Sequence, residues 1–129
     1  MPRFFNPPDI VKPFSSYSQG ALVEGPARWL HISGQVGARA DGTLEQGFEA
    51  QAKRSWSNLL AVLKAGGMEP GDLVMVNVYI TRAGDVAASR RIRDEALAGA
   101  APASTMLIVS ALALPELLFE VDAVAARSL

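Results

Sequence analysis

The sequence predicts an α+β domain in which a sheet is covered on one face by two helices. Two stretches carry apolar residues at helical spacing, and five shorter runs are β-rich or alternate between apolar and polar residues. Along the chain these elements follow the order β-β-α-β-α-β-β, which is typical of an α+β sheet. With 129 residues, the chain predicts a single domain over residues 1–129.

The N-terminal region is predicted to be an extended arm followed by a hairpin. Residues 1–14 contain Pro2 and three further prolines, which disfavour a helix. Two β-like runs follow at residues 15–23 and 27–33, and the Glu24-Gly25-Pro26 segment between them predicts a turn. Tyr17 lies in the first run, and Ser33 closes the second.

The centre of the chain predicts a helix, a strand and a second helix. Apolar residues recur at helical spacing on one side of the first helix, and Gly66-Gly67 supplies a left-handed cap at its end. These apolar residues are Phe48, Ala52, Trp56, Leu59 and Leu63.

Residues 72–81 are then predicted to form a strand. This strand is largely apolar on both faces, which indicates a central position in the sheet. Leu73, Asn77 and Tyr79 are expected on one face of this strand, and Val76 and Val78 on the other. A shorter and more polar helix at residues 85–97 follows, and it ends before Gly99 to Pro102.

The C-terminal quarter predicts a pair of strands, at residues 105–110 and 117–125, joined by a turn at Leu-Pro-Glu. In the second strand Glu120 and Asp122 share the face opposite Phe119 and Val121, and they lie among apolar neighbours. Such a carboxylate loses hydration, so its pKa is expected to rise unless a cation or several N–H donors lie opposite. This makes Glu120 a candidate acid/base group. The alternative is that both acids are ordinary surface charges.

Composition narrows the possible partners. Half of the residues are hydrophobic, 19% are charged and the mean hydropathy is +0.19, which predicts that part of the surface lies in a subunit interface. The formal net charge is -1 and no long basic run is present, so a nucleic acid is not favoured as a partner. Without a signal-peptide pattern or a long apolar stretch, we expect a cytoplasmic protein with no membrane partner.

Known catalytic motifs are missing from the sequence. The chain has no P-loop, GxGxxG or GxSxG pattern, no cysteine and only one histidine. His31 and Ser33 share a strand face and could form a dyad, but no orienting acid is placed beside them, so a structural role for His31 is favoured. We expect no cofactor and no metal site. The remaining possibility is small-molecule chemistry performed by a carboxylate, hydroxyls, arginines and backbone groups.

Five segments in order resemble the Rid family, also called YjgF/RidA or L-PSP endoribonuclease-like proteins. The segments are Tyr17-Ser18-Gln19-Gly20, residues 32–36 (ISGQV), residues 59–67 (LLAVLKAGG), residues 74–81 (VMVNVYIT) and residues 119–125 (FEVDAVA). The resemblance implies a chorismate-mutase-like fold, a homotrimer and pockets between neighbouring subunits. It also implies a small anionic metabolite as substrate, because well-known members hydrolyse reactive enamines and imines to a 2-oxo acid and ammonia.

The family's site residues carry over only in part. The resemblance implies that Tyr17 and Glu120 are catalytic, Glu120 handling the attacking water, and that Ser33 and Met106 lie at the substrate. Active deaminases carry an arginine in a Pro-Ala-Arg segment, where this chain has Ser104. A serine offers one neutral donor in place of a bidentate charged pair.

Two arginines of the second predicted helix are candidates to replace the missing charge. Arg90 and Arg93 are three residues apart and share a helical face, whereas Arg91 points elsewhere. We expect Arg90 to bind the substrate; the alternative is that all three arginines decorate an exposed face.

Two classes of function follow from these residues. One is a hydrolase of the 2-iminobutanoate/2-iminopropanoate deaminase type with altered substrate anchoring. The other is a trimer of the same fold that binds a small ligand or a client protein without turnover. A ribonuclease ranks third because the charge balance offers no surface for RNA.

Overall fold

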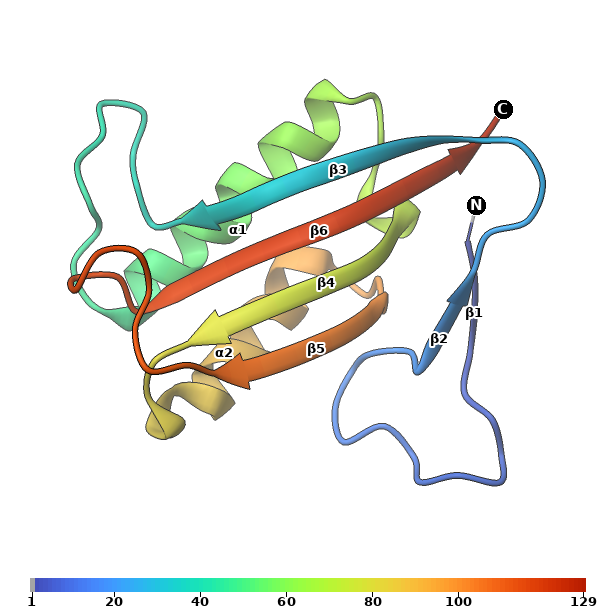
Figure 1. Cartoon of the computed structure of the whole chain (residues 1–129), viewed down its shortest axis with the longest axis horizontal. Coiled ribbons are helices and arrows are strands. Elements are labelled where there is room, and N and C mark those ends of the chain that lie inside the picture. Colours follow the sequence, from blue (N-terminus) through green and yellow to red (C-terminus); the bar gives the residue numbers. More distant parts are fainter. Residues whose placement is uncertain (1) are drawn as a thin grey trace.

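In the computed structural model, which describes residues 2–129, a four-stranded sheet carries both helices on one face (Figure 1). The strands are, in spatial order, β3 (Ala27–Val36), β6 (Phe119–Ser128), β4 (Leu73–Ile80) and β5 (Ala103–Ile108). β4 and β5 are parallel, while β6 is antiparallel to both β3 and β4. The predicted α+β class, with two helices on one face, is therefore confirmed.

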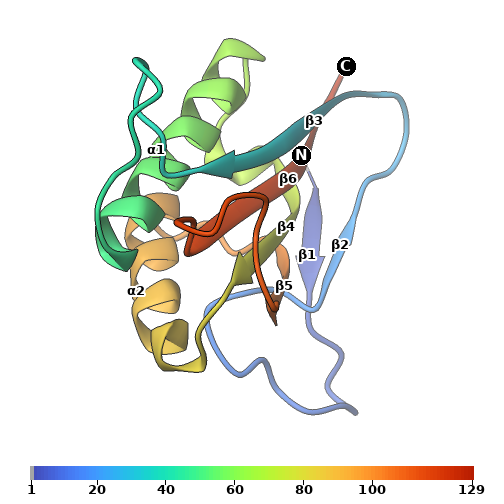
Figure 2. The ribbon, with the colours of Figure 1, turned by 60° about the vertical axis from the view of Figure 1, so that its left-hand side comes forward.

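Helices α1 (Phe48–Ala65) and α2 (Val86–Leu97) lie side by side over the sheet (Figure 2). Short 3-10 helices, η1 (Pro70–Asp72) and η2 (Ala83–Asp85), precede β4 and α2. Two further strands, β1 (Arg3–Phe5) and β2 (Gly20–Leu22), pair with each other outside the main sheet. Among residues 2–129, no helix is both long and apolar enough to cross a membrane.

The core forms between α1 and the covered face of the sheet. All five apolar residues predicted to line one side of the first helix are buried, and the rings of Phe48 and Phe119 meet edge to face at 5.9 Å. On β6 the odd-numbered residues from Phe119 to Ala125 are buried, as the alternation predicted. α1 ends at the double glycine, where Gly67 takes the left-handed conformation with φ 75°.

Two predicted strand pairings are wrong. β2 does not form a hairpin with β3, because it pairs with β1 and so ties the N-terminal arm to residues that follow it. β5 and β6 do not pair with each other either. α2 serves as the crossover that makes β5 parallel to β4, and β6 then fills the position between β3 and β4.

Two β-bulges account for two further differences. A register shift between Leu73 and Met75 turns Leu73 into the core, although the alternation of β4 placed it on the opposite face. A second shift, between Ile32 and Gln35, lets β3 continue past Ser33, where the sequence predicted its end.

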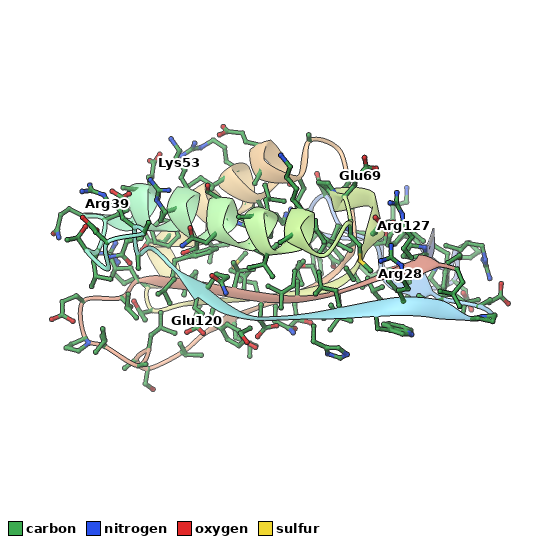
Figure 3. The ribbon with its side chains drawn as sticks, turned by 90° about the horizontal axis from the view of Figure 1, so that it is seen from above. Arg28, Arg39, Lys53, Glu69, Glu120 and Arg127 are labelled. Carbon is green, nitrogen blue, oxygen red and sulfur yellow. The ribbon has the colours of Figure 1, made fainter. Side chains whose placement is uncertain are left out.

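No helix of the described chain covers the other face of the sheet, which we call the uncovered face (Figure 3). Figure 3 shows Glu120 on this face, across the sheet from Lys53 of α1. Apolar side chains are exposed on the same sheet, including Trp29 at 53% and Leu107 at 50%. Exposed apolar side chains on a sheet face that no helix covers are a feature of interaction surfaces.

Candidate active site

The first candidate site is a cavity of about 200 Å³ at the β5 edge of the sheet, beneath α2. It is lined by Phe14, Ser15, Tyr17, Arg90, Arg93, Ser104 and Met106. We call it the arginine cavity.

The arginine cavity lies on the helix-covered side of the sheet. Ser104 pairs with Val76 and Met106 with Val78, and both valines are buried in the core. Because paired residues of adjacent strands point to the same face, Ser104 and Met106 point toward α2.

Tyr17 reaches the arginine cavity because Ser18 attaches the arm to the sheet. The hydroxyl of Ser18 donates to the carbonyl of Ala101 at 2.6 Å, and its backbone N–H donates to the carbonyl of Pro102 at 3.1 Å. These bonds hold the arm at the start of β5. The hydroxyl of Tyr17 in turn accepts a long hydrogen bond of 3.4 Å from the backbone of Phe14.

The three arginines of α2 differ in environment. Arg93 is 4% exposed, and its Nε and Nη2 both donate to Oδ1 of Asp94, at 3.1 and 3.0 Å. Arg91 points outward and pairs with Glu49 at 3.0 Å. Arg90 is half-buried and has no hydrogen bond or ion pair within residues 2–129. Its guanidinium is the charge in the cavity that remains available to a ligand.

The second candidate site is a cavity of about 390 Å³ on the uncovered face. It is lined by Tyr79, Val109, Ala111, Leu112, Ala113, Glu120 and Asp122. We call it the carboxylate cavity. Glu120 forms no hydrogen bond or ion pair with any described residue, and its carboxylate lies against the backbone of Gly34.

Asp122 has a different environment from Glu120. Its Oδ1 accepts from Nδ2 of Asn77 and its Oδ2 accepts from the hydroxyl of Tyr79, both at 2.8 Å. The hydrogen bond to Asp122, burial, the charge of Asp122 and, last, the charge of Glu120 raise the pKa of Tyr79 above its ordinary value. Asp122 is thus engaged by side-chain donors, whereas Glu120 is free to act on a ligand.

Gln51 of α1 supports the loop that leads to Glu120. Its Nε2 donates to the carbonyls of Glu45 and Glu116, and its Oε1 accepts from the backbone N–H of Leu118 at 2.8 Å. The side chain is buried, so these bonds are sheltered from water. Gln51 is not among the site residues predicted from the sequence, although a polar residue next to the apolar positions of a helix is a usable signal.

The structure divides the predicted site residues between two places. Tyr17, Arg90, Ser104 and Met106 line the arginine cavity, and Glu120 lines the carboxylate cavity. Ser33 is exposed on β3 at the bulge, and no hydrogen bond joins it to His31 in the described chain. Since the two cavities lie on opposite sides of the sheet, one chain does not bring Glu120 to Arg90.

The fold and its two cavities define a small α+β protein of the YjgF/L-PSP type. The sequence profile of the family described as Endoribonuclease L-PSP matches residues 8–127, and the chain belongs to this family, which is also known as the Rid family.

Three relatives illustrate the range of the similarity. The crystal structure of YyfB from Yersinia pestis, a conserved Rid family protein of unknown function, is 34% identical, covers 98% of both chains and has a TM-score of 0.89. A RutC family protein of Aquifex aeolicus is 35% identical over 80 residues, which cover 61% of this chain and 62% of that protein. A 2-iminobutanoate/2-iminopropanoate deaminase of Dermatophagoides farinae is 27% identical over 112 residues, or 85% of each protein.

Proposed function

We propose that this chain hydrolyses small imines or enamines at a site completed by a second copy of itself, within a homotrimer. The observation that carries the proposal is the unpaired carboxylate of Glu120 on the uncovered sheet face, apart from the unpaired guanidinium of Arg90. A neighbouring copy that packs on the uncovered face would bring its arginine cavity to Glu120. Family membership and the deaminase relative support this reaction class.

The proposed reaction needs one proton-handling group and no oxidant or reductant. Glu120 takes a proton from water as the water oxygen bonds to the imine carbon, and the imine nitrogen gains a proton. The carbon–nitrogen bond of this carbinolamine then breaks. As it breaks, the hydroxyl proton passes through Glu120 to the nitrogen, the oxygen becomes the carbonyl of the product, and the nitrogen leaves as ammonia. An enamine enters the same sequence after a proton adds to its carbon.

Substrate anchoring is proposed to rest on Arg90 in place of an arginine at position 104. Its half-buried guanidinium can donate to a small carboxylate, and charge-assisted hydrogen bonds of this kind are the strong ones. The short side chain of Ser104 leaves room for a bulkier group. Ser33, at the β3 bulge, lies on the strand that passes beneath Glu120 and is proposed to contact the substrate.

The test is turnover of imino acids generated in the assay by a pyridoxal-phosphate dehydratase, followed as the rate of 2-oxo acid formation. Glu120→Gln keeps the side-chain shape and should abolish acceleration by the protein without unfolding it. Glu24→Gln, an exposed acid in the turn before β3, is the matched control and should behave as wild type. Tyr17→Phe should be milder than Glu120→Gln.

The alternative function, a trimer that binds a ligand without turnover, predicts the opposite result. In that case wild type would leave the rate of 2-oxo acid formation unchanged while still binding small carboxylates. Full activity in Glu120→Gln would return Glu120 to the role of a surface charge.

A further inference from the structure

The register of β4 and β6 arranges four polar side chains on the uncovered face. Tyr79 lies directly opposite Glu120, and Asn77 lies directly opposite Asp122. Directly opposed residues of antiparallel strands have Cβ atoms about 5 Å apart, and diagonal neighbours about 7–8 Å apart. The long tyrosine side chain therefore reaches the diagonal Asp122, where its hydroxyl donates a hydrogen bond of 2.8 Å.

This diagonal bond determines what the Tyr79 hydroxyl can still do. A phenol has one hydrogen to donate and lone pairs that accept. The hydrogen is used on Oδ2 of Asp122, and Oδ1 of Asp122 is occupied by Asn77. Toward the carboxylate cavity, which Tyr79 lines beside Glu120, its oxygen can therefore act only as an acceptor.

Two acceptors side by side match the two hydrogens of one water molecule. A water that gives one hydrogen to Glu120 and the other to Tyr79 has its lone pairs turned away from both side chains. This is the orientation that a nucleophilic water needs, because the lone pair forms the bond to the electrophilic carbon.

We propose that Tyr79 holds the hydrolytic water together with Glu120, and that Asp122 is a positioning residue that keeps the Tyr79 hydroxyl turned as an acceptor. This inference rests on the proposed function and adds a second contact to the water. In the reaction, the water hydrogen that is donated to Glu120 is the one transferred. The water hydrogen that is donated to Tyr79 stays on the water oxygen and becomes the hydroxyl hydrogen of the carbinolamine.

The kinetic test compares Tyr79→Phe with Asp122→Ala in the imino acid assay. Tyr79→Phe should lower kcat by about tenfold and change KM less than about twofold, because the lost contact is to water and not to the substrate. Thr105→Val is the matched control, since it removes an exposed hydroxyl from the neighbouring strand, opposite Asn77, and should leave both constants unchanged.

Asp122→Ala frees the Tyr79 hydrogen to compete for Glu120, so it should also lower kcat. If Asp122 acts only through Tyr79, the double variant should lose no more than the worse single variant. The inference would be overturned if the fold-losses of kcat in the two single variants multiply in the double variant. A wild-type kcat in Tyr79→Phe would overturn it as well.

A second measurement does not depend on turnover. Crystals of the wild type should show an ordered water within hydrogen-bond distance of both the Glu120 carboxylate and the Tyr79 hydroxyl. Crystals of Tyr79→Phe should lack that water while Glu120 stays over Gly34. An unoccupied position in the wild type would refute the inference whatever the activity, whereas full turnover in Glu120→Gln would refute the proposed function.

Discussion

The carboxylate of Glu120 lies so close to Gly34 that a Cβ at position 34 would overlap its Oε2 and would meet its Cδ at 2.8 Å. The bulge of β3 between Ile32 and Gln35 brings this glycine beneath Glu120. The missing side chain of Gly34 therefore makes the space that the Glu120 carboxylate occupies.

Replacing this glycine should damage the site more than the fold. In Gly34→Ala the new methyl group displaces the flexible end of the Glu120 side chain, so we expect turnover to fall by about tenfold or more, equivalent to about 1.4 kcal/mol in the activation free energy. The midpoint of thermal unfolding should change little. Gly84→Ala is the matched control, because its Cβ would meet nothing within 4 Å and its φ is also not positive. Equal activity in both variants would contradict this role for Gly34.

Arg90 should carry the affinity for small carboxylates. Arg90→Ala is expected to weaken binding of a 2-oxo acid by about 1.5–3 kcal/mol, the value of a hydrogen bond to a charged group. Titration calorimetry measures this loss, and Arg91→Ala, which removes an arginine paired at the surface with Glu49, should leave affinity unchanged.

The same anchor predicts the behaviour of Ser104→Arg. A second guanidinium in the arginine cavity would repel Arg90, so this variant should not gain activity toward 2-aminoacrylate. If Ser104→Arg does gain that activity while Arg90→Ala binds carboxylates normally, the anchor is not Arg90.

Assembly should depend on the uncovered face of the sheet. At micromolar concentration, light scattering should give three times the chain mass of 13.7 kDa. Leu107→Asp adds a charge to β5 beside Tyr79 and should shift the mass toward the monomer. Ile10→Asp, at a similarly exposed residue of the N-terminal arm, is the control. A monomeric mass for the wild type would contradict both the proposed trimer and the proposed shared site.

Alkaline pH should weaken the fold through Tyr79. Its pKa is raised above the ordinary 10.0, so the neutral phenol is favoured in the folded state. The resulting stability is fully present below the unfolded-state pKa and is lost as pH rises through the folded-state pKa. Chemical denaturation at fixed protein concentration measures the free energy of unfolding of wild type and of Tyr79→Phe. The amount by which the wild-type value exceeds that of Tyr79→Phe should shrink at pH values above about 10. A constant difference between the two proteins would show that the hydroxyl does not titrate in this way.

Local patterns in the chain were sufficient to predict the helices and which side of α1 and β6 is buried. Helical spacing identified the core residues of α1, and alternation separated Glu120 and Asp122 from Phe119 and Val121, because both patterns follow from repeats of the backbone itself. The spacing of Arg90 and Arg93 likewise predicted that they share a surface, and both line the arginine cavity.

Strand pairing and the contacts of each polar side chain were decided by the tertiary structure. Local sequence favoured hairpins between neighbouring strands, but the crossover through α2 placed β4 beside both β5 and β6. Only that register sets Tyr79 diagonal to Asp122, and only the bulge in β3 places Gly34 under Glu120. These contacts join residues more than 40 positions apart, so neither helical spacing nor strand alternation contains them.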